Sequence, residues 1–161
     1  MRRLLVPLLA LVIVPTATAA FSVTLNSTSP QTFAAITLNG VDQTKTLPIT
    51  ITVTNTGGGN GAGWNVTAAA AAPTSAAGTL SPLQVTAVSA AACTGGGCVN
   101  PTNSIGVPVI LSSTAAKIFN AAVGTGKGSV VLTATLQMTY DANALPANYT
   151  SALTVTGSTG P

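Results

Sequence analysis

Apolar residues alternate with hydroxyl-bearing residues along much of this chain, and this alternation constrains the fold more than any other feature. The clearest runs lie at residues 47–54, 130–140 and 149–156, with shorter ones at 21–25, 36–38, 64–68, 83–87 and 105–111. Successive side chains of a β-strand point to opposite faces of the sheet, so alternation is typical of strands with one buried face. Threonine fills most of the polar positions, where its β-branched side chain suits the pleated surface.

Clusters of glycine, proline and asparagine separate these runs, at residues 57–61, 95–97, 124–128 and 143–146 among others. Short strands with turn signals between them predict an all-β fold, an antiparallel β-sandwich of the immunoglobulin-like kind. The alanine-rich residues 68–72 continue the pattern that starts at Trp64, so we predict a strand there although alanine favours helices. Residues 113–123 fit either a strand or a short helical turn.

The first 19 residues predict an export signal. A positively charged start precedes an apolar run at residues 4–14, and Ala17 and Ala19 then give the small-x-small pattern of a cleavage site. The run is about half of the roughly 20 residues that cross a bilayer, so no transmembrane anchor is expected. We expect cleavage after Ala19, which leaves residues 20–161 as one secreted, extracellular domain.

The exported domain has very few ionisable side chains. It keeps only Asp42, Lys45, Lys117, Lys127 and Asp141, and the chain contains no histidine and no glutamate. Acid–base catalysis and metal binding at neutral pH depend on such groups, so neither an enzyme nor a metal or cofactor site is expected. The domain also lacks the basic stripe that binding to nucleic acid requires.

Cys93 and Cys98 are the only cysteines. In an exported chain such a pair predicts a disulfide, and the glycines at residues 95–97 let the backbone turn back between them. No histidine or third cysteine completes a zinc set, and the spacing is not the Cys-x-x-Cys of redox catalysts. The bond is therefore expected to be structural.

Two further motifs have structural interpretations. Asp42 and Asp141 could form the carboxylate pair of a hydrolase, but each lies beside turn residues, where aspartate commonly caps the backbone. Residues 124–128 look like a phosphate-binding loop. However, Ala121 stands where the Walker spacing needs a glycine, and a strand pattern follows, so we expect a hairpin turn.

Trp64, the only tryptophan, admits two interpretations. In the alternating pattern it shares a face with Val66 and Ala68 and belongs to the core, whereas an exposed indole on a sheet could stack on sugar rings. If the domain has a binding face, the candidate residues are Trp64, Asn65, Thr67 and Tyr149, with the glycine-rich loop at residues 57–63 beside them.

Two segments resemble the WxL-domain surface proteins of Gram-positive bacteria. The first runs from residue 47 through a glycine turn to the triplet Trp64-Asn65-Val66, and the second runs from Tyr149 to Gly160-Pro161. Valine takes the leucine position of the first Trp-x-Leu motif, and Leu153 and Val155 take the tryptophan and leucine positions of the second.

This resemblance covers residues 20–161. It implies a β-rich secreted domain that holds to peptidoglycan without covalent attachment. We therefore expect a non-enzymatic cell-surface domain that contacts cell-wall polymer or other surface proteins. The alternative is a structural or adhesive subunit that assembles by β-strand addition, as pilins do, with the uncharged residues 21–25 as the donor strand.

Overall fold

The computed structural model describes residues 21–27, 31–57 and 61–161, and within these ranges it contains strands, turns and loops but no helix. The strands are β1 (Phe21–Leu25), β2 (Gln43–Asn55), β3 (Trp64–Ala70), β4 (Thr74–Ser75), β5 (Gly78–Thr79), β6 (Gln84–Ala90), β7 (Thr94–Val99), β8 (Val109–Ile110), β9 (Ala116–Ala121), β10 (Lys127–Tyr140) and β11 (Leu153–Thr159). The predicted export signal at residues 1–19 lies outside the described residues. No part of the described chain forms a helix that could span a membrane.

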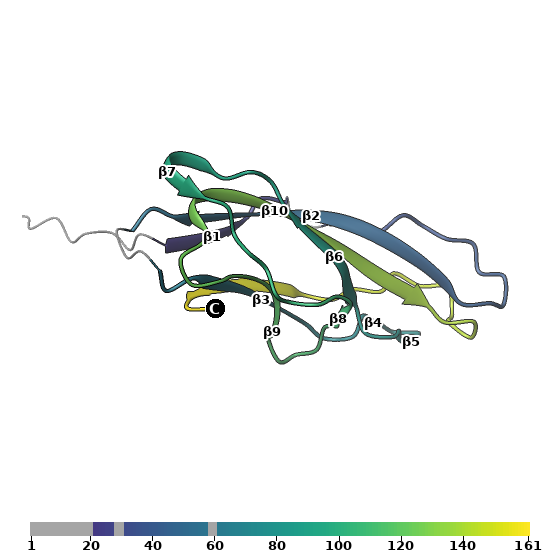
Figure 1. The fold of residues 1–161 in the computed structure, drawn as a ribbon. Coiled ribbons are helices and arrows are strands. Elements are labelled where there is room, and N and C mark those ends of the chain that lie inside the picture. The colour runs from purple at the N-terminus through teal and green to yellow at the C-terminus, as the bar shows by residue number, and fades with distance from the viewer. Residues whose placement is uncertain (1–20, 28–30, 58–60) are drawn as a thin grey trace, which may run out of the picture.

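All the strands pair antiparallel, which confirms the predicted all-β class. A six-stranded sheet has the order β1-β2-β10-β6-β8, with β7 also paired to β10, and a three-stranded sheet has the order β11-β3-β9. Figure 1 shows the first sheet above the second, and one hydrophobic core takes residues from both. The immunoglobulin-like or WxL-like form of this arrangement stays a prediction.

The longest strands, β2 and β10, form the spine of the six-stranded sheet. Their register places Ile51 opposite Leu132 and Val53 opposite Val130, and all four side chains are buried. The positions that alternate with these apolar residues along β2 and β10 are more exposed, and they include five threonines, at residues 50, 52, 54, 133 and 135. The alternation of apolar and hydroxyl residues therefore corresponds to the inner and outer faces of this sheet.

The three-stranded sheet contains part of each of the two segments, at residues 68–72 and 113–123, for which the sequence allowed either a strand or a helix. The alanine-rich segment is a strand as predicted up to Ala70, where β3 ends, and it buries Ala68 and Ala70 in the core, whereas residues 71–72 lie outside the strand. The helical turn considered for residues 113–123 is wrong, because β9 occupies Ala116–Ala121. A helix there would have left the backbone groups along one edge of β3 without partners, and buried backbone groups need hydrogen bonds.

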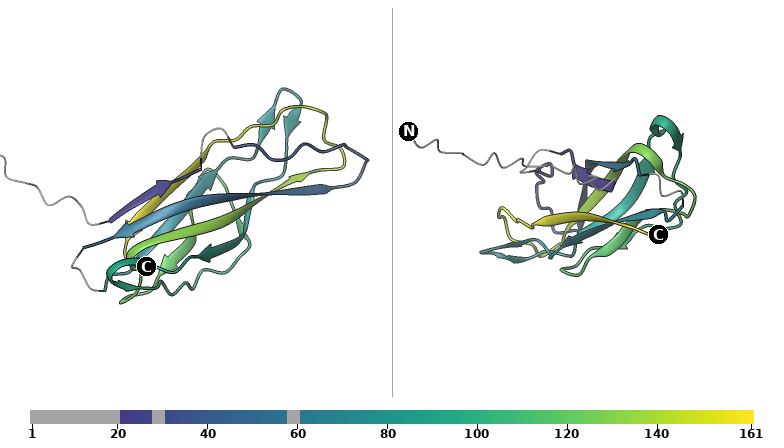
Figure 2. Two further views of the ribbon diagram at one scale, coloured as in Figure 1. Left: turned by 90° about the horizontal axis from the view of Figure 1, so that it is seen from above. Right: turned by 90° about the vertical axis from the view of Figure 1, so that its left-hand side faces the viewer.

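The two sheets approach each other closely where β1 faces β11. A side chain at Gly157 of β11 would collide with Val23 and crowd the ring of Phe21, so glycine lets the strands pack at this distance. The long strands continue beyond the smaller sheet to the end of the molecule that carries residues 39–42 and 141–148 (Figure 2). We call this the distal end.

Candidate functional site

The structure corrects the binding face proposed around Trp64. The indole has no exposed surface, stacks on Phe119 with ring centroids 5.7 Å apart, and lies 6.4 Å from the ring of Phe21. Its Nε1 donates a hydrogen bond of 2.7 Å to the carbonyl oxygen of Gly126. The core interpretation of Trp64 is therefore confirmed, and this ring cannot stack on a ligand.

Asn65 is also unavailable as a contact residue. Only 6% of it is exposed, and its Nδ2 donates hydrogen bonds to Ser158 Oγ (2.9 Å) and to the carbonyl oxygen of Gly160 (2.8 Å). Thr67 is partly exposed and shares a hydrogen bond of 2.7 Å with Thr156. Part of the loop at 57–63 lies outside the described residues. The four predicted residues therefore do not form one face.

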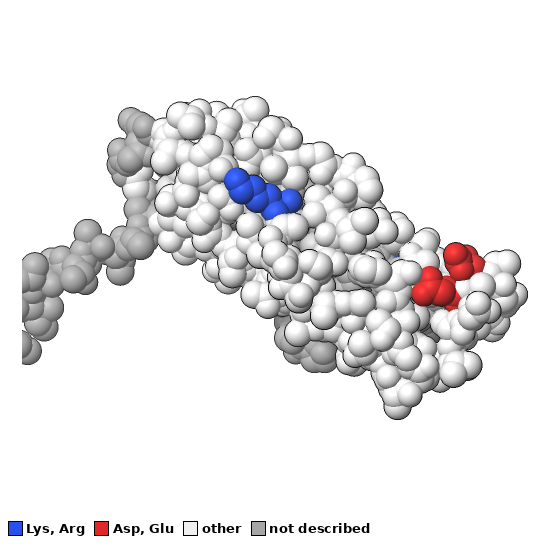
Figure 3. All heavy atoms as spheres, turned by 90° about the horizontal axis from the view of Figure 1, so that it is seen from below, with Lys and Arg blue, Asp and Glu red and all other residues white. Residues whose placement is uncertain are grey.

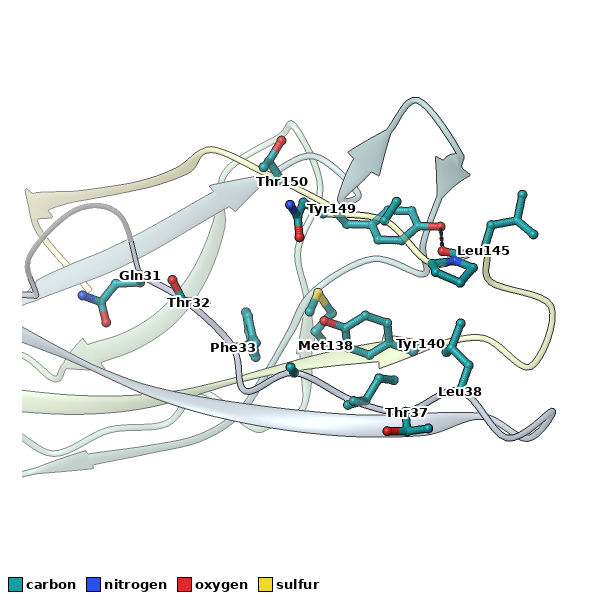
Figure 4. Close-up of a pocket in the computed structure, with 15 residues that line it drawn as sticks. Gln31, Thr32, Phe33, Thr37, Leu38, Met138, Tyr140, Leu145, Tyr149 and Thr150 are labelled. Atoms are coloured by element: carbon teal, nitrogen blue, oxygen red, sulfur yellow. Dashed lines mark hydrogen bonds between the residues drawn. The ribbon is translucent and has the colours of Figure 1, made fainter.

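Tyr149, the fourth candidate, lies instead in a groove at the distal end. We call this the distal groove. It has a volume of about 940 Å³ and is bounded by residues 31–38 on one side and 145–150 on the other, with Met138 and Tyr140 between them. Figure 4 shows Phe33 and Leu38 on the first wall, Tyr149 and Leu145 on the second, and the Tyr140 ring between the walls. Sequence reasoning did not identify this groove.

Aromatic residues give the groove its apolar character. The chain has six aromatic residues, and Phe33, Tyr140 and Tyr149 line the groove, whereas Phe21 and Phe119 each contact Trp64 in or beside the core. Both tyrosines of the chain are thus in the groove. This concentration of tyrosines at the ends of two strand patterns was the signal in the sequence that could have pointed to the site.

The two tyrosine hydroxyls differ in their partners. Tyr149 Oη donates a hydrogen bond of 2.9 Å to the carbonyl oxygen of Leu145, which fixes its ring against its own wall. Among the described residues, Tyr140 Oη has no hydrogen-bond partner, and partial burial raises the pKa of this phenol above its ordinary value. Tyr140 therefore offers a neutral hydroxyl that can donate to or accept from a ligand.

The polar groups along the groove are all neutral. Besides the two tyrosine hydroxyls, they are the amides of Gln31 and Asn148 and the hydroxyls of Thr32, Thr37 and Thr150, and no lining residue carries a charge. A second hollow of about 400 Å³ continues from the groove toward the core, between Leu25, Leu47, Leu136 and Leu153. The arrangement combines ring faces, amides and hydroxyls around an open space, as binding sites for neutral polar ligands do.

The remaining sequence motifs are structural. Cys93 and Cys98 form the predicted disulfide. Asp42 accepts a hydrogen bond from the amide of Ala142, and Asp141 accepts two from Ser81, so both aspartates hold turns as expected. Figure 3 shows the two carboxylates side by side at the distal end. The hairpin turn predicted at residues 124–128 is wrong. β9 and β10 belong to different sheets, so residues 122–126 cross from one sheet to the other, and Lys127 and Gly128 already lie in β10.

The described residues contain no group of three side chains suited to hold a metal ion. The lining of the distal groove has no acid–base pair of ordinary catalytic type. No protein-family model, no curated protein and no solved structure matches this chain.

Proposed function

We propose that this chain is an exported, non-enzymatic domain of the cell surface that associates non-covalently with peptidoglycan through the distal groove. The observation that carries the proposal is the groove itself, which is uncharged and lined by two tyrosines, a phenylalanine, amides and hydroxyls. The export signal and the resemblance to WxL-domain proteins support the location and the class of ligand.

The chemistry of the groove fits the glycan part of the wall polymer. Aromatic rings offer large apolar faces with a polar tip, which suits the alternating apolar and hydroxyl surfaces of a sugar ring. Amide and hydroxyl groups can exchange hydrogen bonds with sugar hydroxyl and acetamido groups. The absence of charge along the lining favours these neutral groups, because a buried unpaired charge would be costly to desolvate.

A sedimentation assay with purified, insoluble peptidoglycan tests the proposal. The wild-type domain should appear in the pellet, and Tyr149→Ala and Tyr140→Ala should each weaken binding about tenfold, which corresponds to about 1.4 kcal/mol. Tyr149→Phe keeps the ring and is the matched variant, because it should retain most of the binding. Thr67→Ala, on the other sheet, is the control outside the groove.

If the wild-type domain stays in the supernatant, peptidoglycan binding is wrong. If Thr67→Ala lowers the bound fraction as much as the tyrosine variants do, the polymer binds elsewhere and the groove assignment is wrong. Circular dichroism of each variant establishes that the protein is folded before its binding is compared.

One observation favours the alternative, assembly by strand addition. Strand β1 pairs with only residues 51–55 of β2, so within the described ranges 21–27, 31–57 and 61–161 the same edge of β2 has no strand partner from Gln43 to Thr50. The backbone amide of Asn26 donates to the carbonyl oxygen of Thr50, so the backbone groups of Thr50 point to this edge. Because the direction of these groups alternates along a strand, those of Thr44, Thr46 and Pro48 point to it as well. Among the described residues, no hydrogen bond reaches the backbone of Thr44 or Thr46 there.

Such an open edge is a template for another strand. Residues 32–38 run beside it (Figure 2), and a donor strand would displace them. Thr46→Pro removes one donor from this edge only, and Pro48 shows that β2 accommodates proline. Oligomers that form at high concentration and disappear in Thr46→Pro, but persist in Thr46→Ala, would favour assembly. A monomer at every concentration excludes it.

A further inference from the structure

One wall of the distal groove lies outside the sheets. Residues 32–38 belong to no strand. Phe33 and Ile36 are three positions apart, so a regular strand would place their side chains on opposite faces, yet both are partly buried and line the groove. This wall therefore depends on its side-chain contacts and on its two ends for its position.

The end of this wall is tied to the start of β2 by side chains. Gln43 Nε2 donates to the carbonyl oxygen of Thr37 and to Asn39 Oδ1, both at 2.9 Å. The next residue before β2 is Asp42, whose Oδ1 accepts a hydrogen bond of 2.7 Å from the amide of Ala142. Ala142 lies just after β10, in the loop that leads to the opposite wall at residues 145–150.

The bond between Asp42 and Ala142 thus joins the bases of the two walls, across a sequence separation of 100 residues. The neighbouring carboxylate, Asp141, does not bond to either wall within the described chain. It accepts hydrogen bonds from the backbone amide and the hydroxyl of Ser81. The two aspartates are close on the surface (Figure 3), but only Asp42 joins the wall that precedes β2 to the wall that follows β10.

We propose that Asp42 is a positioning residue that sets the separation of the two walls of the distal groove and, through it, the affinity for ligand. The part that concerns affinity rests on the proposed function. The part that concerns the walls does not, and it can be measured on the protein without ligand.

The wall separation can be measured between nitroxide labels on Ala35→Cys and Ala147→Cys, one exposed residue on each wall. The native cysteines stay in their disulfide. Double electron–electron resonance should give a narrow distance distribution in the labelled parent and a broader or longer one after Asp42→Ala. Asp42→Asn keeps an oxygen acceptor at the same place and should restore the narrow distribution. Asp141→Ala is the matched control and should leave it narrow.

The unlabelled variants are then compared on insoluble purified peptidoglycan. Asp42→Ala should lower the affinity about tenfold or more, whereas Asp42→Asn and Asp141→Ala should bind as the wild type does. An unchanged distance distribution in Asp42→Ala overturns the proposal, as does a distribution in Asp42→Asn that is as broad as in Asp42→Ala. A wild-type domain that fails to bind refutes the proposed function, while the distances still decide the role of Asp42.

Discussion

Trp64 Nε1 donates a buried hydrogen bond to the carbonyl oxygen of Gly126. This bond links the central strand of the smaller sheet to the turn that starts β10, the longest strand of the larger sheet. The amide of Gly126 in turn donates to the carbonyl oxygen of Val99, at the end of the strand that holds the disulfide. Gly126 is therefore hydrogen-bonded both to the indole of Trp64 in the smaller sheet and to the end of β7 in the larger sheet.

Gly126→Ala should strongly destabilise the fold. The added methyl group would collide with the indole of Trp64 and the side chain of Ala121, and the residue has a φ of 73°. We expect a loss of roughly 2–4 kcal/mol in the free energy of unfolding, measured by urea denaturation. Gly124→Ala is the control. It has a similar φ of 81° but open space around it, so it should lose only about 1 kcal/mol. Equal losses would show that the contact with Trp64 does not matter.

Fluorescence should report the shielded environment of Trp64. It is the only tryptophan, so the emission comes from this one ring. We expect a blue-shifted maximum and little quenching by iodide in the folded protein, with both properties lost in denaturant. Addition of peptidoglycan fragments should not change the quenching. Strong quenching of the native protein by iodide would contradict the buried position.

Loss of the disulfide should lower stability without changing the fold. Cys93 and Cys98 close a short loop, for which the chain-entropy estimate is about 2 kcal/mol. The double variant Cys93→Ser/Cys98→Ser should lose about this amount and should not respond to a reducing agent, whereas the wild type should lose it on reduction. A wild type whose unfolding is the same with and without reductant would refute the prediction.

Tyr140 should make stability fall in alkaline solution. Burial raises its pKa in the folded state, so over the interval between the unfolded and folded pKa values only the unfolded chain has lost the proton. The stabilisation that comes from keeping this phenol neutral in the folded state is fully present below about pH 10, and it is lost as the pH rises through the folded pKa. Tyr140→Phe has no phenol to titrate and should show a shallower fall. Parallel curves of unfolding free energy against pH for the two proteins would contradict this.

Much of the fold could be predicted because its determinants are local. The alternation in β2 and β10 matched the buried and exposed faces. The presence of only two cysteines in a chain with an export signal, with glycines between them, predicted the bond between Cys93 and Cys98. The segment at residues 113–123 was harder, because Ile118, Phe119, Asn120 and Ala121 are all buried in succession and leave no period of two. Asn120 can be buried because its Oδ1 accepts a hydrogen bond from the amide of Ser104, a partner that the sequence does not indicate.

The site was harder to predict than the fold. Asn65 reads as an outward-facing polar residue, and only the return of Ser158 and Gly160 over it explains its burial. The distal groove depends on residues 31–38, where only residues 36–38 alternate and no strand forms, and on a loop more than 100 residues later in the chain. Tyr149 was a candidate on its own, but nothing local to it predicts that Phe33 and Tyr140 lie across the same groove.

Chemical-shift mapping tests the central claim, that the distal groove binds wall glycan, most directly. Soluble peptidoglycan fragments are added to the ¹⁵N-labelled domain, and the amide shifts of the folded protein are followed. Saturable changes are expected at Phe33, Tyr140 and Tyr149 and their neighbours. No saturable change at these positions, or changes centred on Thr67 and Thr156 of the smaller sheet, would contradict it.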